Sequence, residues 1–135
     1  MIGFLGTYQV SLDEKGRINV PAKFKAILDK QYDNHQLVVT VMKDEDKQYL
    51  VAFPQKEWLI NEEKLSDLSG LDREDRDKMR AVYAQASECE IKSGKVLIQQ
   101  NQREKVGLKK EVVLVGMSKT FEIWAADQAA KLLDV

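Results

Sequence analysis

YQVSLDEKGRINVPAKFKAIL, residues 8–28, is the stretch that decides the fold of this chain. Apolar and polar residues alternate over Tyr8–Leu12 and again over Arg17–Val20, which is the period of a half-buried β-strand. Between the two runs, Gly16 supplies the positive φ that a tight turn needs, and the Asp13 side chain can accept hydrogen bonds from nearby backbone N–H groups. The pattern predicts a β-hairpin with a charged tip.

A short helix is predicted directly after this hairpin. Pro21 cannot donate to a strand ladder, and its fixed φ suits the first turn of a helix. Phe24, Ile27 and Leu28 then follow the i, i+3, i+4 spacing of one buried helical face. We therefore expect the second strand to stop at Pro21 and a helix to pack behind the hairpin.

Length and composition limit the class of protein. The chain has 135 residues, of which 44% are hydrophobic and 32% charged, and this suits one globular domain or two small fused ones. No apolar run approaches the ~20 residues of a membrane helix, and residues 1–5 lack the basic start and cleavage site of a secretion signal. Cys89 is the only cysteine, so no internal disulfide can form. These features predict a cytoplasmic protein without a membrane partner.

Charge is unevenly distributed along the chain. The net charge of −1 divides into +2 for residues 1–43, −6 for residues 44–90 and +3 for residues 91–135. The two mildly basic ends permit a surface that binds a polyanion. Taken alone, the charge favours an ordinary solvated surface.

The middle of the chain predicts two more strands and two helices. Residues 37–42 and 49–53 read as buried strands joined by a charged turn. Pro54 begins a helix that contains Trp58, Leu59 and Leu65, and Asp72 is the expected N-cap of the next helix, with Asp75 as its capping-box partner. The apolar face of that helix is formed by Met79, Val82, Tyr83 and Ala86.

From Ser87 the opening pattern recurs. Residues 91–98 read as strand, glycine turn and strand, and residues 102–106 form a short helix that ends at Gly107. Strands over 112–115 and 121–124 follow, and Gly94 lies 78 positions after Gly16. This spacing indicates a tandem duplication. We expect two ββαββ units that pair into one closed, barrel-like core, in the α+β class and mostly β.

Several motifs resemble those of the MraZ family, bacterial regulators built from two SpoVT-AbrB-type units. They are residues 4–6 (FLG), 11–25 (SLDEKGRINVPAKFK), 86–90 (ASECE), 107–117 (GLKKEVVLVGM) and 121–124 (FEIW). The resemblance spans nearly the whole chain in the right order. It implies a double-split β-barrel built from two pseudo-symmetric ββαββ repeats with added helices.

The resemblance also implies a domain layout and a function. The expected parts are residues 7–54 (first SpoVT-AbrB-like repeat), 55–85 (helical connector), 86–126 (second repeat, with a degenerate hairpin tip) and 127–135 (C-terminal helix). The implied function is sequence-specific binding to double-stranded DNA, at promoter repeats upstream of a division and cell-wall gene cluster. The implied form is a ring-shaped homo-oligomer, cytoplasmic and associated with the nucleoid.

Arg17 is the residue expected to contact a base. Its rigid fork of donors matches the O6/N7 edge of guanine in the major groove, and Asp13 is spaced to pair with the guanidinium across the turn. Residues expected to orient the turn or to contact phosphates are Asp13, Lys15, Gly16, Asn19, Lys23 and Lys25. The alternative is that Asp13 and Arg17 form only a surface ion pair that closes a turn, worth ~0–1 kcal/mol.

The sequence departs from the family pattern at two places. Leu5 stands where family members often have an arginine, which removes one possible phosphate contact. The second turn, Lys92–Lys95, is one residue shorter than expected, and no aspartate in it can orient a cation. Lys92 and Lys95 are therefore expected to contribute only weaker phosphate contacts, because a lysine cannot form a planar fork.

Other residues that could support chemistry have ordinary explanations. His35 is the only histidine and Cys89 the only cysteine, so neither a Cys/His metal site nor a Ser-His-Asp constellation can be assembled, and we expect no enzyme activity, metal or cofactor. The acidic run Asp44–Asp46 is expected to be a solvated turn, with a cation site as the alternative. Trp58 and Trp124 are expected in the core or at subunit contacts.

Two functions from different classes remain open from the sequence. The first is the DNA-binding regulator. The second is a ring-forming scaffold or interaction protein of the same fold that has lost useful DNA affinity through its altered second turn. We also expect a homo-oligomer larger than a dimer, because Phe53, Trp58, Trp124 and Leu132 exceed what one small barrel readily buries.

Overall fold

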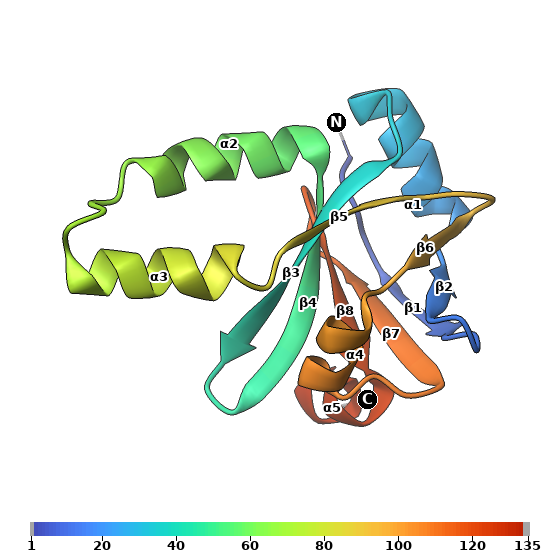
Figure 1. Ribbon diagram of the computed structural model, residues 1–135. Coiled ribbons are helices and arrows are strands. Elements are labelled where there is room, and N and C mark those ends of the chain that lie inside the picture. Colours follow the sequence, from blue (N-terminus) through green and yellow to red (C-terminus); the bar gives the residue numbers. More distant parts are fainter. Residues whose placement is uncertain (1, 134–135) are drawn as a thin grey trace.

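The computed structural model describes residues 2–133 and is of the α+β class, as predicted. Figure 1 shows a twisted antiparallel sheet with helices around it and a helical arm that extends to one side. In chain order the elements are β1 (Thr7–Ser11), β2 (Arg17–Asn19), α1 (Ala22–Ile27), the π-helical turn η1 (Leu28–Tyr32), β3 (Gln36–Asp44), β4 (Lys47–Pro54), α2 (Gln55–Ser66), α3 (Arg73–Tyr83), β5 (Ser87–Glu90), β6 (Lys95–Leu97), α4 (Gln100–Val106), β7 (Glu111–Gly116), β8 (Phe121–Ala125) and α5 (Ala126–Leu133). Residues 134 and 135, which the predicted last helix included, lie outside the described residues.

The strands form two separate sheets. A six-stranded antiparallel sheet has the order β1-β7-β8-β4-β3-β5, and β2 pairs with β6 in a two-stranded ribbon. Strands from the two ends of the chain are therefore direct neighbours, as the pairs Gln9↔Val113 and Ile18↔Val96 illustrate.

The predicted hairpin between residues 8–12 and 17–20 is wrong beyond its tip. The two strands share only the bridge Leu12↔Ile18, after which β1 continues alongside β7 and β2 alongside β6. The second unit behaves in the same way, with one bridge between Lys92 and Lys95 before its strands separate. Each pair separates because its strands bury their apolar faces against the other half of the chain.

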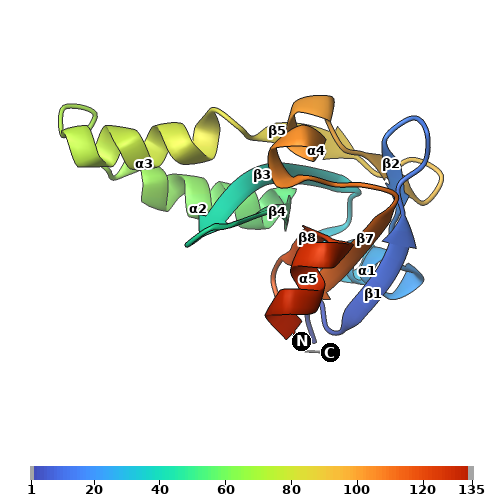
Figure 2. The same cartoon turned by 90° about the horizontal axis from the view of Figure 1, so that it is seen from below.

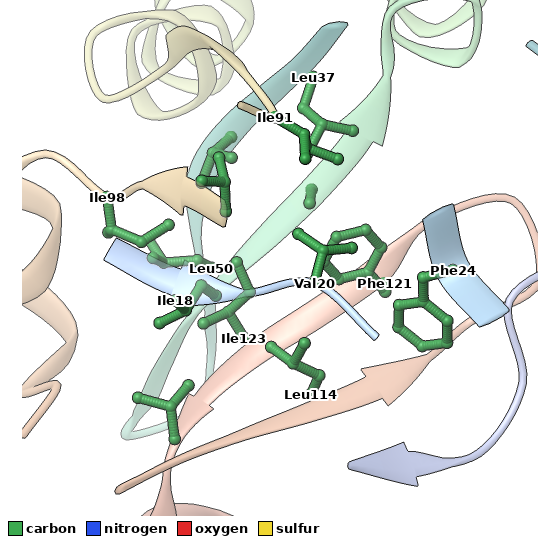
Figure 3. Packing of buried hydrophobic residues seen from close by; sticks show 14 of the residues in the cluster. Ile18, Val20, Phe24, Leu37, Leu50, Ile91, Ile98, Leu114, Phe121 and Ile123 are labelled. Atoms are coloured by element: carbon green, nitrogen blue, oxygen red, sulfur yellow. The ribbon is translucent and has the colours of Figure 1, made fainter. Parts of the chain in front are cut away.

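The main core lies between the ribbon and the sheet. Ile18 and Val96 of the ribbon are buried in one cluster with Leu50, Leu114 and Ile123 of the sheet. Figure 3 shows Ile18 together with these three sheet residues. Phe24 closes one end of this core against Phe4 and Phe121, at ring-centroid distances of 5.1 and 5.0 Å. Full burial of one such side chain contributes about 1.5–3 kcal/mol, so this core fixes the ribbon over the sheet.

A second apolar cluster covers the other face of the sheet, under α2 and α5. Tyr49 stacks on Trp124 at 4.4 Å, and Phe53 packs edge-on against Trp58 at 5.3 Å. The expectation that these aromatic residues need another subunit to bury them is wrong, since Phe53, Trp58 and Trp124 are each at most 8% exposed within one chain. Leu132, by contrast, is 43% exposed.

Helices α2 and α3 form the arm seen in Figures 1 and 2. Asp72 caps α3 as predicted, and its Oδ1 accepts hydrogen bonds from the backbone N–H groups of Glu74 and Asp75. The predicted capping box is wrong, because the Asp75 carboxylate accepts from the backbone N–H of Ser69 instead. Trp58 is the one buried residue of α2, and α3 has none, so the arm is held mainly at its root.

None of the helices in residues 2–133 is long and apolar enough to cross a membrane.

Candidate nucleic-acid interface

The loop from Asp13 to Arg17 is a tight connection of three residues. The Arg17 carbonyl accepts from the backbone N–H of Asp13 at 2.9 Å, and the Asp13 carbonyl accepts from that of Gly16 at 3.0 Å. Gly16 has a φ of +86°, where glycine is strongly favoured. The glycine predicted to form the turn is therefore required by the backbone itself.

The Asp13 carboxylate organises this loop. Its Oδ1 accepts from the backbone N–H groups of Lys15 and Arg17, and its Oδ2 accepts from Arg17 Nε, each at 2.9 Å. Hydrogen bonding from the Arg17 backbone, reinforced by the Arg17 guanidinium, lowers the pKa of Asp13 to about 2 against a smaller opposing effect of burial. Asp13 is therefore ionised at neutral pH, and its pairing with Arg17 agrees with their spacing in the sequence.

Arg17 is held at one edge and free at the other. Asp13 engages Nε, whereas the side chain is 40% exposed, so the two terminal Nη groups are left as donors. Strand alternation places Ile18 in the core and turns Arg17 and Asn19 outward. The arrangement presents a planar pair of N–H donors at the edge of a two-stranded ribbon.

The second unit completes the outer face of this ribbon. Arg17 lies opposite Leu97, and Asn19 lies opposite Lys95. Leu97 is 45% exposed and was missed by the sequence analysis, although its alternation with buried Val96 was the signal that could have found it. An exposed aliphatic side chain beside donor groups suits the methyl group of thymine.

Lys95 is part of the Asp13 cluster, which corrects the prediction that no aspartate orients a cation of the second unit. Its Nζ lies 3.6 Å from Asp13 Oδ2, so one carboxylate faces cations from both units. The shortened second turn is confirmed: Ser93 and Gly94 both have positive φ, as in a type I′ turn, and Lys92 and Lys95 exchange two backbone hydrogen bonds. Lys92 is exposed beside this turn.

The remaining predicted residues are distributed around this cluster. Lys15 is exposed at the tip of the first loop. Lys23 and Lys25 are on α1, and Lys23 borders a hollow with Leu5 and Tyr8. In both Figures 1 and 2 the loops before β2 and β6 project at the same edge of the molecule, away from the helical arm.

Arg103 on α4 is a further cation at this site that the sequence analysis missed. Its guanidinium lies against the backbone of buried Gly16, where a Cβ atom would be 2.6 Å from Arg103 Cζ. The repeat spacing could have found it, because Arg103 lies 78 positions after Lys25, as Gly94 does after Gly16. The second unit therefore supports the first turn directly.

The other candidates have structural explanations. Burial raises the pKa of the Cys89 thiol to about 12, so it is protonated at neutral pH. His35 contacts Asp29 in the first turn of η1, and Asp44 accepts a hydrogen bond from the Tyr49 hydroxyl at 2.8 Å. Among residues 2–133 there is no cluster of three or more His, Cys, Asp or Glu side chains that could hold a metal ion.

Comparison with known proteins points to one family. Residues 3–81 and 82–134 each match the family described as "MraZ protein, putative antitoxin-like". Over 122 residues the chain is 39% identical to a protein of Photorhabdus laumondii named "Transcriptional regulator MraZ", covering 90% of this chain and 78% of that protein. A protein of the same name from Carboxydothermus hydrogenoformans is 38% identical over 125 residues, covering 92% of this chain and 82% of the relative.

Proposed function

This chain belongs to the MraZ family, and we propose that it is a transcriptional regulator that binds specific sequences in double-stranded DNA. The shared name of the relatives supports this function, and it is the name of a regulator rather than of an enzyme. As the family resemblance implies, the proposed targets are promoter repeats upstream of a division and cell-wall gene cluster. The proposed location is the cytoplasm, on the nucleoid.

The observation that carries the proposal is the fixed direction of Arg17. Asp13 Oδ2 accepts from Nε at 2.9 Å, so the guanidinium plane is set before any ligand arrives. The free Nη edge then offers two parallel donors, and guanine offers two acceptors, O6 and N7, in the major groove. A two-stranded ribbon is narrow enough to enter that groove. Arg17 is therefore the proposed base contact, with Asp13 as the residue that directs it.

The other cations fit contacts to phosphates. Lys15 is exposed at the loop tip, and Lys92 is exposed beside the second turn. Lysine is a flexible point charge that holds a phosphate without reading a base. Asn19, Lys23, Lys25 and Lys95 belong to the same proposed surface, with Asn19 and Lys95 paired across the ribbon.

We propose that the fold is a double-split β-barrel of two pseudo-symmetric repeats, residues 7–54 and 86–126. The strand order β1-β7-β8-β4-β3-β5 supports this, since exchanging each strand with its counterpart in the other repeat reproduces the same order. The β2–β6 ribbon pairs two counterparts with each other. Residues 55–85 would then be the connector and residues from 127 onward the closing helix.

We further propose a homo-oligomeric ring. Leu59 and Ile60 on α2 are 55% and 50% exposed, so the arm has apolar surface that a neighbouring subunit could cover. Several linked subunits on repeated sites also multiply weak individual contacts through effective concentration. Light scattering at micromolar concentration tests this proposal, and a stable monomer would contradict it.

The test of DNA recognition is an anisotropy competition at one fixed salt concentration. Wild type, Arg17→Lys and Arg17→Ala are titrated against a duplex from upstream of the protein's own gene and against a scrambled duplex. A bidentate contact to guanine contributes about 1–3 kcal/mol of discrimination, roughly 5–150-fold, so both variants should lose site preference. Arg17→Lys should retain part of the non-specific affinity.

Lys78→Ala is the matched control, because it removes one exposed charge on α3, on the opposite side of the molecule from the ribbon (Figure 1). Unchanged site preference in Arg17→Lys would reduce Arg17 to a phosphate contact. A wild-type protein without measurable affinity for either duplex would favour the scaffold function instead.

A further inference from the structure

Arg103 is a partly buried cation without an internal partner. Its Nε atom is buried and has no hydrogen-bond partner, and among residues 2–133 its side chain makes no hydrogen bond or ion pair. Arg17, the residue that follows Gly16, has its Nε engaged by Asp13. Leaving a guanidinium partly desolvated and unpaired is unfavourable, so this position favours an anion supplied from outside the chain.

The surroundings of Arg103 form a recess next to the first turn. Gly107 ends α4 with a φ of +69°, and the backbone N–H of Leu12 donates to the Lys110 carbonyl at 2.8 Å, which holds the loop after α4 against the end of β1. One hollow lies between Leu12, Arg103 and Lys109, and a second lies between Asp13, Lys109 and Lys110. Leu12 and Lys109 border both hollows, so the two lie next to each other beside the start of the Asp13–Arg17 loop, and together they are called the groove.

Three acidic residues border the groove, and none of them pairs with Arg103. Glu104 borders the first hollow, and its Oε1 accepts from Gln100 Nε2 at 3.0 Å. The loop acid Asp13 is already engaged by Arg17 and Lys95. Glu14 also borders the second hollow, and neither it nor Arg103 and Lys109 forms an ion pair among residues 2–133. Arg103 and Lys109 therefore stay available to an anion from outside the chain.

We propose that Arg103 and Lys109 bind a backbone phosphate of the DNA strand that Arg17 contacts, so that the second unit serves the turn of the first. This inference rests on the proposed function. A guanidinium with free donors and a nearby ammonium group match phosphate oxygens in charge and geometry. The second unit thus contacts DNA through α4 and the loop that follows it, as well as through its own turn.

The proposal separates phosphate binding from base recognition. Loss of a phosphate contact weakens binding to all sequences similarly and lowers the slope of log Kobs against log salt by ~0.9. Loss of support for the Arg17 turn, the competing role, would instead remove site preference and leave the salt slope nearly unchanged. Measuring both quantities in the same variants distinguishes the two roles.

The experiment titrates cognate and scrambled duplexes at several sodium chloride concentrations. Arg103→Ala and Lys109→Ala should each weaken binding to both duplexes by a similar factor and lower the slope by up to ~0.9, and the double variant should lower it by no more than ~0.9, because both cations share one phosphate. Arg103→Lys should recover most of the slope. Arg73→Ala on α3 is the control, since it removes an exposed arginine far from the groove, and it should behave as wild type. Lys109 is exposed, so its variant tests the site even if Arg103→Ala does not fold.

A further titration adds inorganic phosphate in place of chloride at equal ionic strength. Free phosphate should compete with the DNA phosphate for the same donors, so it should inhibit wild type more than Arg103→Ala. A site for free phosphate alone would instead leave Arg103→Ala with wild-type affinity for DNA in chloride, which would overturn the proposal. Unchanged salt slopes in Lys109→Ala and in a folded Arg103→Ala would overturn it as well. Failure of wild type to bind DNA would refute the proposed function and this site together, and it is recognised by the wild-type titration alone.

Discussion

Replacing Gly16 by alanine tests the contact between the two units at the turn. Gly16 and Gly94 occupy equivalent turns, with φ of +86° and +74°, and a left-handed conformation costs a non-glycine residue about 1–2 kcal/mol. At Gly94 a Cβ atom would meet nothing within 4 Å, whereas at Gly16 it would lie 2.6 Å from Arg103 Cζ. The guanidinium is the end of a flexible side chain and can shift, so the added cost is at the low end of the range for overpacking, about 1 kcal/mol. Gly16→Ala should therefore cost about 2–3 kcal/mol and Gly94→Ala about 1–2 kcal/mol.

The assay is urea unfolding followed by the fluorescence of the buried Trp58 and Trp124, at one protein concentration. Each glycine variant is measured in the wild-type background and in the Arg103→Ala background. Without the guanidinium, only the backbone strain at Gly16 remains, so Gly16→Ala should fall to the cost of Gly94→Ala. The Gly94 variant should be insensitive to Arg103.

An equal cost for Gly16→Ala in both backgrounds would refute the reasoning. It would mean that the Arg103 side chain does not rest on the turn. Equal costs for Gly16→Ala and Gly94→Ala in the wild-type background would refute it too, since the two positions would then differ in nothing but a small change of φ.

Three further measurements follow from the structure. The pKa of Asp13 is lowered to about 2. Its ionised carboxylate should therefore stabilise the turn fully above its ordinary pKa of about 4, and this stabilisation should be lost only as the pH falls towards 2. An NMR titration of this carboxyl with a midpoint near 4 would contradict the hydrogen-bond network around it. Burial raises the pKa of the Cys89 thiol to about 12, so a thiol reagent at neutral pH should react slowly with the folded protein and rapidly with the protein unfolded in urea. Equal reaction rates in the two states would show that the thiol is accessible in the folded protein. Asp72→Ala should lower the free energy of unfolding by about 0.5–2 kcal/mol, because α3 loses its N-cap. Urea unfolding measures this, with Asp67→Ala as the comparison. Equal free energies of unfolding for the two variants would mean that the cap is not formed in solution.

Local structure was predictable from this sequence because its signals are local. The strands over 37–42 and 112–115 follow from runs of apolar residues, and Pro21 and Pro54 mark where helices begin. The Asp13–Arg17 pair followed from a spacing of four residues across a glycine turn.

Strand pairing was not predictable in the same way. Tyr8–Leu12 alternates as a hairpin strand would, but alternation indicates which face is buried and not which strand lies alongside. The position of Arg103 against Gly16 depends on that long-range pairing, so the sequence around Arg103 indicates only an ordinary helix. The expectation that one chain could not bury Phe53, Trp58 and Trp124 failed for a related reason, because the cluster that buries them is assembled from elements far apart in the chain.

The pairing of β1 with β7 and of β2 with β6 has a consequence for how the protein is made. On the ribosome, residues 1–86 emerge first and contain Asp13, Gly16 and Arg17, but the strands that flank this loop have no partners until residues 95–116 follow. Contacts between such distant segments form slowly, since a long stretch of chain must be ordered first. A nascent or truncated chain ending near residue 86 should therefore show rapid amide exchange at residues 17–19, and the surface proposed to recognise DNA exists only once residues 95–116 have been made.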